Sequence, residues 1–398
     1  MRTVLFTGKG GVGKTSVAAA TAIAAARAGK RTLVVSTDAA HSLSDSIDAP
    51  LGNTPTAVRA VPGLHGLQVD ACERLEDAWA DVAGYLIELF GWAGVDAVEA
   101  EELATLPGLE EVFALTAIEE QAASGAWDAL IVDCAPTAET VRLLSLPDIL
   151  GWYVDRVFPA TRTMARIARP LMSRIAQLPP VANDQVFTAL ERLLGRLDRV
   201  RLLLADEQHT TLRLVVNPER MVVAEARRTA TYLALFGYRV DAVVANRLLP
   251  QAVSDPWFDA WRATHAEQLA AIEDGFAPVP VLRADLAQEE LVGVERLTAF
   301  AETLYGELDP MAVLHTGPGL EISRTPTGSM LRLPLPFCDH DELEVGRRDG
   351  ELLVRVGPYR RAVGLPDSLR RRPVVGAGLE DGWLRVDFGA VGAAAMQT

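Results

Sequence analysis

The chain has 398 residues, which is enough for two domains or for one large domain with an appendage. Hydrophobic residues make up 49% of the chain and charged residues 23%, a balance typical of a globular protein and not of a disordered one. With 38 basic and 53 acidic residues the net charge is −15, which argues against non-specific nucleic-acid binding. We therefore expect no nucleic-acid partner.

The first eleven residues, MRTVLFTGKGG, are a short strand that runs into a glycine loop, without the charged and then apolar pattern of a leader segment. The longest apolar run, residues 17–26, is too short to span a bilayer. We therefore expect a cytoplasmic protein. The three cysteines, Cys72, Cys134 and Cys338, are far apart and form no CxxC motif, so we predict neither a disulfide framework nor a zinc site.

Strand and helix patterns alternate along residues 1–310, which we expect to form one domain. Apolar, β-rich runs predict strands at 3–7, 32–36, 128–133, 213–218 and 240–247. Helical patterns lie at about 15–28, 73–90, 109–124, 222–236 and 256–271. Strands separated by helices form parallel βαβ units, so the fold class is α/β with a mostly parallel sheet. We expect helical insertions at about 73–125 and 148–210.

The pattern changes after Pro310 to short strands at regular spacing. RRDGEL (347–352) and LEDGWL (379–384) are typical of β-hairpins. Residues 314–398 hold eleven arginines and eleven acidic residues, so the negative charge of the protein belongs to the preceding part of the chain. We predict a small all-β sandwich at 317–390.

Residues 8–15, GKGGVGKT, match the phosphate-loop motif G-x-x-x-x-G-K-[ST] and stand between a predicted strand and a predicted helix. Glycines let backbone N–H groups point at a triphosphate, and the helix N-terminus adds its positive end. Lys14 should reach the β- and γ-phosphates, and the Thr15 hydroxyl should bind Mg²⁺. The motif predicts a P-loop NTPase whose nucleotide contacts are Gly8, Lys9, Gly10, Gly11, Val12, Gly13, Lys14, Thr15 and Ser16.

Lys9 is one lysine more than this chemistry requires. The chain has only three lysines, Lys9, Lys14 and Lys30, and two of them lie in this loop. Near the start of the loop, Lys9 should point away from the phosphates of its own protomer and reach the nucleotide of a second copy across a two-fold axis. There it would neutralise charge that develops during phosphoryl transfer. The alternative is a lysine that is merely solvated.

Two aspartates follow strands at the sheet edge where ligands bind in open α/β folds. Asp38, in STDAAHSLSDS (36–46), could hold a water in line with the γ-phosphorus, or could only cap the next turn. Asp133, at the end of DALIVD, is the expected carboxylate of the Mg²⁺ shell. Pro136 and Thr137 follow it in a segment that could sense the γ-phosphate, and we expect His41 to be a packing or hinge residue.

Two later residues are candidates for base recognition. The amide of Asn246, at the end of VDAVVANR, can both donate to adenine and accept from it. Glu219, in NPERMVVAEARR, could give polar support in the same neighbourhood. A lone asparagine after a strand is also a common turn residue.

These motifs together resemble the arsenite-pump and tail-anchored-protein-targeting ATPases, the ArsA/GET family. The resemblance rests on GKGGVGKT, STDAAHSLSD, PGLEEVFAL (107–115), DCAPTAETVRLLSLP (133–147) and the NPE…EARR…ANRLLP series, in order over about 1–305. It implies a nucleotide-gated homodimer in which Lys9 acts in trans, Asp38 positions the attacking water, Asp133 lies in the Mg²⁺ shell, and Glu219 and Asn246 lie near the nucleotide, with Asn246 on the base.

The departures from this family pattern also carry information. STDPAH of the family is STDAAH here, and no cysteine follows ANRLLP, where eukaryotic members have a zinc-binding CxxC. There is one phosphate loop, not the two of the pump ATPase, and three scattered cysteines offer no thiolate cluster for arsenite. The tail, with its two DG hairpins and an intervening GLP, resembles an α-crystallin (small heat-shock-protein) domain.

Residues 161–180 place Met164, Ile167, Leu171, Ile175 and Leu178 on one stripe of a helical pattern, although Pro170 should kink it. The stripe could line a client groove or could be ordinary core packing. We predict a homodimeric Mg²⁺-ATPase, without zinc, that couples hydrolysis of ATP to ADP and phosphate to a hydrophobic or amphipathic protein client or a lipid-like ligand, with a membrane-associated receptor as a further candidate partner. The alternatives are an ATP-gated holdase with incidental hydrolysis, an arsenite-efflux ATPase and a partitioning-type ATPase.

Overall fold

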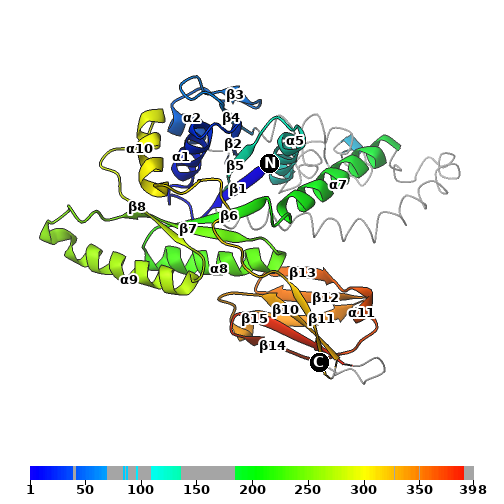
Figure 1. The fold of residues 1–398 in the computed structure, drawn as a ribbon. Coiled ribbons are helices and arrows are strands. Elements are labelled where there is room, and N and C mark those ends of the chain that lie inside the picture. The colour runs from blue at the N-terminus through cyan, green and yellow to red at the C-terminus, as the bar shows by residue number, and fades with distance from the viewer. Residues whose placement is uncertain are drawn as a thin grey trace.

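A computed structural model describes residues 1–38, 42–69, 84–85, 87, 96, 109–135, 184–326, 328–348 and 350–389. Its largest feature is a mostly parallel sheet with helices on both faces, joined to two small antiparallel sheets at the C-terminal end (Figure 1). The predicted α/β fold with an all-β appendage is therefore confirmed. The predicted client stripe at 161–180, together with His41, Pro136 and Thr137, lies outside the described residues, as does most of the predicted helix at 73–90.

The described part of the large sheet has eight strands. In spatial order they are β3 (Thr56–Ala57), β4 (Leu64–Gln68), β2 (Thr32–Ser36), β5 (Ala129–Asp133), β1 (Arg2–Thr7), β6 (Thr210–Val216), β7 (Val240–Leu248) and β8 (Val281–Asp285). All neighbours are parallel except β3 and β4. The carboxyl ends of the parallel strands therefore meet at one edge of the sheet, where a ligand site is expected.

Helices cover this sheet as the alternating pattern requires. They are α1 (Lys14–Arg27), α2 (Ser42–Ile47), α5 (Leu109–Ala123), α7 (Asp184–Leu204), α8 (Arg220–Phe236), the short η1 (Pro256–Phe258), α9 (Asp259–Phe276) and α10 (Val294–Tyr305). Helices α1 and α10 pack together on one side, and α8 and α9 lie under β6, β7 and β8 on the other (Figure 1). The sequence patterns missed β4, β8 and α10.

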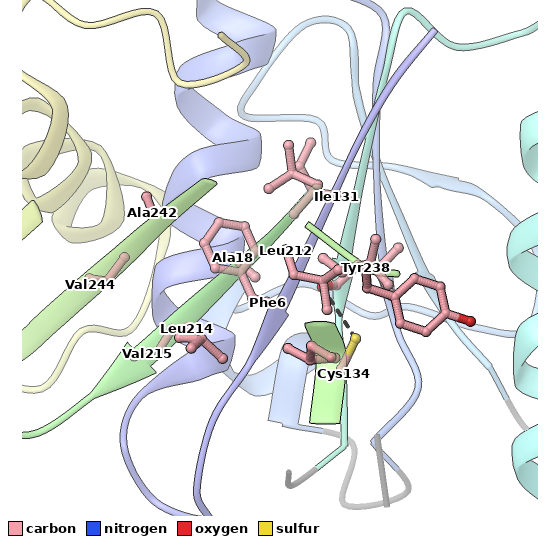
Figure 2. Packing of buried hydrophobic residues seen from close by; sticks show 14 of the residues in the cluster. Phe6, Ala18, Ile131, Cys134, Leu212, Leu214, Val215, Tyr238, Ala242 and Val244 are labelled. Atoms are coloured by element: carbon pink, nitrogen blue, oxygen red, sulfur yellow. Dashed lines mark hydrogen bonds between the residues drawn. The ribbon is translucent and has the colours of Figure 1, made fainter. Parts of the chain in front are cut away.

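The core lies between α1 and the central strands. Helix α1 is rich in alanine and is buried on nearly every side, so its small side chains allow the helix to approach the sheet closely. Figure 2 shows Phe6 of β1 and Ala18 of α1 among the side chains of Ile131, Leu212 and Leu214. This packing fixes the strand that leads into the glycine loop and the helix that follows it.

A fully buried ion pair ties the end of this domain to the sheet. Arg213 and Asp241 are completely shielded from solvent, and Arg213 Nε donates to Asp241 Oδ1 at 3.2 Å. Arg2 Nη2 donates to the other carboxylate oxygen at 3.0 Å. Arg213 also donates to the carbonyl oxygen of Pro310 and to the hydroxyl of Tyr305. The segment that leaves the first domain is therefore anchored to β6 and β7.

The C-terminal part forms two antiparallel sheets. One contains β14 (Val374–Glu380), β15 (Trp383–Phe388), β10 (Gly328–Pro334) and β9 (Glu321–Thr325), and the other β11 (Leu343–Arg348), β12 (Glu351–Val356) and β13 (Tyr359–Gly364). The short η2 (His340–Glu342) and α11 (Asp367–Arg370) connect strands. Both hairpins expected at DG dipeptides are present, as β11–β12 and β14–β15. Buried and part-exposed residues alternate along β10, β12 and β15, so each sheet buries one face.

The C-terminal sheets pack against α8 of the first domain. Arg361 Nη1 donates to the Leu235 carbonyl oxygen at 2.6 Å, and the rings of Tyr232 and Tyr359 lie 4.6 Å apart between centroids. Thr231 Oγ1 donates to the Pro336 carbonyl oxygen at 2.5 Å. Helix α8 of the first domain therefore carries the appendage (Figure 1).

Candidate nucleotide-binding site

The glycine loop joins β1 to α1 at the carboxyl edge of the sheet. Gly11 and Gly13 have φ values of 80° and 92°, a left-handed backbone that strongly favours glycine. A Cβ atom at Gly8 would lie 2.2 Å from the Val215 carbonyl oxygen of β6, so the loop can begin here only because Gly8 has no side chain. The local sequence therefore folds this segment into an anion-binding loop at the N-terminus of a helix.

Lys14 is the first residue of α1 and is 7% exposed. Its Nζ donates to the Lys9 carbonyl oxygen at 3.3 Å, and Val12 N donates to the same oxygen at 3.5 Å. The ammonium group therefore lies against the loop itself, in the position from which it can reach a bound phosphate chain.

The predicted metal-binding side chains are brought together. Thr15 Oγ1 donates to Asp133 Oδ2 at 2.8 Å and lies 3.2 Å from Ser42 Oγ. Ser36 Oγ donates to the same carboxylate oxygen at 3.3 Å. Asp133 is fully buried, and its Oδ1 has no hydrogen-bond partner among the described residues. A buried carboxylate oxygen without a partner, next to a hydroxyl, fits Mg²⁺ or a water bound to it, because this cation prefers oxygen ligands.

Burial raises the pKa of Asp133 to about 6, since the ionised carboxylate loses its hydration. The hydrogen bond from Thr15 and the positive charge of Lys14 act in the opposite direction, while the charge of Asp38 adds to the rise of the pKa. A divalent cation at this place would favour the ionised form. Thr15 and Asp133 are thus the residues that would hold Mg²⁺, which supplies positive charge next to the β- and γ-phosphates.

Asp38 lies at the same edge, two residues beyond the end of β2. Its backbone N donates to Ser36 Oγ at 3.3 Å. Thr37 N donates to the Asp133 carbonyl oxygen at 3.0 Å, which joins the ends of β2 and β5. The strand order therefore places Asp38 near Asp133, although the two residues are far apart in sequence.

The side chain of Lys9 extends toward helix α8. Its Nζ lies 3.8 Å from Glu225 Oε2 on α8, and its side chain is 36% exposed. The two lysines of the loop are therefore in different environments, because Lys14 is buried within the loop and Lys9 is paired at the surface.

The two candidates for base recognition have different surroundings. Asn246 is 4% exposed, and its Nδ2 donates to the Val12 carbonyl oxygen at 2.8 Å. Glu219 is exposed at the N-cap position of α8, and its side chain makes no capping hydrogen bond. Burial lowers the pKa of His265 on α9, and the negative charge of Glu219 acts against this by raising that pKa. The structure thus brings Asn246 to the phosphate loop and Glu219 to the outer rim.

Sequence reasoning did not single out four residues of this region. Ser36 and Ser42 contact Asp133 and Thr15, and Glu225 pairs with Lys9. Asn217, at the end of β6, is 8% exposed, and its Oδ1 has no partner among the described residues. A serine that ends the strand TLVVS was a usable signal for Ser36, whereas the pairing of Lys9 with Glu225 depends on how α8 packs.

The fold and the loop define a P-loop NTPase. A model of the ArsA ATPase family, described as an anion-transporting ATPase, matches residues 1–306, and a model described as an HSP20-like domain found in ArsA matches residues 326–388. The chain belongs to the ArsA ATPase family and is an ATPase. Both resemblances found in the sequence are therefore confirmed.

Similar proteins span nearly the whole chain. A Chlorobaculum tepidum protein named "Putative arsenical pump-driving ATPase" is 38% identical over 393 residues, which are 98% of this chain and 96% of that protein. An Aquifex aeolicus protein named "Putative arsenical pump-driving ATPase 1" is 35% identical, over 93% of this chain and 95% of its own length. The ATPase GET3 of Podospora anserina is 29% identical over 308 residues, 76% of this chain and 90% of its own length.

Two further features of the described residues concern membranes and metals. None of the helices there combines the length and the apolar character needed to cross a membrane. In the same part of the chain, no three side chains of His, Cys, Asp or Glu gather closely enough to hold a metal ion. Thr15 and Asp133, which are joined by a hydrogen bond, are the candidates to hold Mg²⁺.

Proposed function

We propose that this ATPase works in the cytoplasm as a homodimer that couples ATP binding and hydrolysis to the binding of a hydrophobic or amphipathic client. The observation that carries the proposal is the position of Lys9, whose side chain is 36% exposed and pairs with Glu225 on α8. A lysine there is available to a second nucleotide site when two copies meet face to face. Lys14 serves the phosphates of its own protomer.

In this proposal each residue at the edge of the sheet has a separate task. Thr15 and Asp133 hold Mg²⁺, whose charge favours the ionised carboxylate. Asp38 accepts a hydrogen bond from the water that attacks the γ-phosphorus, and Lys9 of the second copy stabilises the charge that develops. Because the catalytic parts assemble only in the closed dimer, hydrolysis by one protomer alone is slow.

Mixing two inactive variants tests the role in trans. Lys9→Ala and Asp38→Asn homodimers should each lose at least about 100-fold in turnover. In the mixed dimer, the Lys9→Ala subunit keeps Asp38 and receives Lys9 from the other subunit, so one of the two sites works. Random 1:1 mixing therefore restores about a quarter of wild-type activity. No recovery after subunit exchange, shown by labelled protein, would exclude action in trans.

The connection to a client rests on the C-terminal domain. This domain packs on α8, and α8 begins directly after Glu219 at the rim of the nucleotide site. A cavity of about 560 Å³ lies in the seam and is lined largely by apolar residues that include Phe276, Phe337 and Trp383. A volume of this size suits a lipid-like ligand or the apolar side chains of a protein. A membrane-associated receptor that takes up the released client would complete the cycle.

An ATP-gated holdase is the second candidate, favoured by the match of residues 326–388 to an HSP20-like domain. In a holdase, nucleotide sets the conformation and hydrolysis is incidental. Steady-state phosphate release with and without an amphipathic peptide separates the two functions. A rise in turnover on adding the peptide supports the coupled ATPase, and a rate that no peptide changes supports the holdase.

Arsenite efflux, which the names of the bacterial relatives suggest, receives less support from the cysteines. Burial raises the pKa of Cys338 to about 11 and also raises the pKa of Cys134, so both thiols stay protonated at neutral pH. Thiolates are the form that binds soft metals and metalloids. A partitioning-type ATPase would need DNA or membrane association, which a net charge of −15 opposes.

A further inference from the structure

Strand β7 is irregular at one position, close to the phosphate loop. Its pairing with β8 shifts between Ala245 and Leu248, where three steps along β7 correspond to two along β8, from Arg283 to Asp285. Arg247, inside this interval, has a φ of 57°. An extra residue in one strand is a β-bulge, and bulges next to functional sites commonly redirect a side chain.

Asn246 lies in the same interval of β7, and its side chain contacts the phosphate loop. Asn246 is buried, and its strand β7 is separated from β1 by β6. Its Nδ2 nevertheless donates to the Val12 carbonyl oxygen at 2.8 Å, although the two residues are 234 positions apart in sequence. Only the amide nitrogen can face this carbonyl, because a carbonyl oxygen accepts and does not donate. The orientation of the side chain is therefore fixed by the loop itself.

The loop and the asparagine fit each other closely. A Cβ atom at Gly13 would lie 2.5 Å from Asn246 Nδ2, so any side chain at Gly13 would displace the amide. Val12 is 1% exposed, and its backbone N donates to the Lys9 carbonyl oxygen. Asn246 thus holds the loop at the residue between two glycines, where the backbone would otherwise be the most free to move.

We propose that Asn246 is a positioning residue that holds the phosphate loop in its anion-binding form, so that binding of the triphosphate depends on it even when no base is present. The amide nitrogen is used by the loop, which leaves the carbonyl oxygen for a base. One side chain then connects the phosphate site with the base site. The inference rests on nucleotide binding alone and does not depend on a dimer or a client.

The test compares a ligand that has a base with one that lacks it. Affinities for Mg²⁺-ATP and for Mg²⁺-tripolyphosphate are measured by calorimetry on wild type and on Asn246→Ala. Loss of one buried hydrogen bond should weaken both ligands by roughly tenfold. Hydrogen exchange of the nucleotide-free protein should show faster exchange at the amides of residues 10–13. Arg247→Lys, which changes the exposed neighbour in the same bulge and keeps its charge, should leave both affinities unchanged.

The outcomes separate positioning from base reading. Loss of ATP affinity with unchanged tripolyphosphate affinity would overturn the proposal, because it is the result expected for a residue that only reads the base. Unchanged affinity for both ligands would overturn it as well. If Asn246→Ala does not fold, Asn246→Leu has a similar shape without the donor and is subject to the same criteria. None of these affinity measurements tests the homodimer proposal, because they report only on nucleotide binding.

Discussion

The ammonium group of Lys9 lies 3.8 Å from the Glu225 carboxylate of the same chain. Both side chains are partly exposed, at 36% and 29%, so the pair is weak and can exchange for a stronger partner. If Lys9 serves the nucleotide of a second copy, Glu225 competes with that nucleotide for the ammonium group. The carboxylate would then hold Lys9 in an inactive position until the dimer closes.

Glu225→Gln should therefore raise turnover by about two- to fivefold at limiting enzyme concentration, since it removes less than about 1 kcal/mol of competing attraction. ATP affinity should not change, because the proposal assigns Lys9 to the nucleotide of the second copy and Lys14 to the phosphates of its own protomer. Phosphate release across a series of enzyme concentrations measures the effect.

Two control variants accompany this measurement. Glu302→Gln, which breaks an exposed pair with Arg27, should leave turnover unchanged. In the double variant with Lys9→Ala, Glu225→Gln should give no gain. A gain that persists without Lys9 would contradict the competition.

Asp38→Asn should keep the affinity for ATP and lose turnover by about 10²–10⁴-fold, because the amide cannot accept the proton of the attacking water as a carboxylate does. Equilibrium binding of a fluorescent ATP analogue and single-turnover phosphate release are the two measurements. Asp45→Asn on α2, a nearby carboxylate in the first turn of a helix, serves as the control. Normal turnover in Asp38→Asn would show that Asp38 only caps the following turn.

Asp133 predicts a dependence of stability on pH in the absence of nucleotide and Mg²⁺. Its folded-state pKa of about 6 lies above the ordinary value of 3.8, so between these values the folded protein binds more protons than the unfolded chain. Stability from this group is therefore lost as the pH rises through that window. Asp133→Asn removes this loss. The melting temperature of the variant minus that of wild type should therefore increase from about pH 4 to about pH 6 and stay constant at higher pH.

Differential scanning fluorimetry of both proteins at each pH measures this difference. Saturating Mg²⁺-ATP should reverse the sign of this difference at neutral pH, so that wild type melts at the higher temperature, because only the carboxylate retains the cation. A difference that does not vary with pH would show that the pKa of Asp133 is not raised in the folded protein.

Asp241→Ala should destabilise the protein by about 3–5 kcal/mol, because it leaves the buried guanidinium of Arg213 without a counter-charge. The matched control is Asp128→Ala, which breaks an exposed pair with Arg31 at 2.7 Å and should change stability little. Urea unfolding followed by tryptophan fluorescence compares the two variants. Equal effects would mean that the burial of the Arg213–Asp241 pair does not determine its importance.

Local sequence rules were enough for much of the fold and of the site. The phosphate loop, the strands that end at Ser36 and Asp133, and both DG hairpins follow from short-range preferences: glycine for left-handed backbone, apolar runs for buried strands, and turn residues at fixed offsets. Strand β4, which contains a glycine, and strand β8, in which exposed Arg283 and Asp285 interrupt the apolar run, have weak patterns and were missed.

The pairings across the site were decided only by the tertiary structure. Lys9 meets Glu225, Ser36 meets Asp133, and Asn246 meets Val12 because the strand order and the packing of α8 bring distant segments to one edge of the sheet. A pattern of hydrophobic residues records which face of an element is buried, but not which element lies against it. The extra residue of β7 is likewise defined only by the pairing with β8, and the interval that contains it holds Asn246, whose amide contacts the phosphate loop.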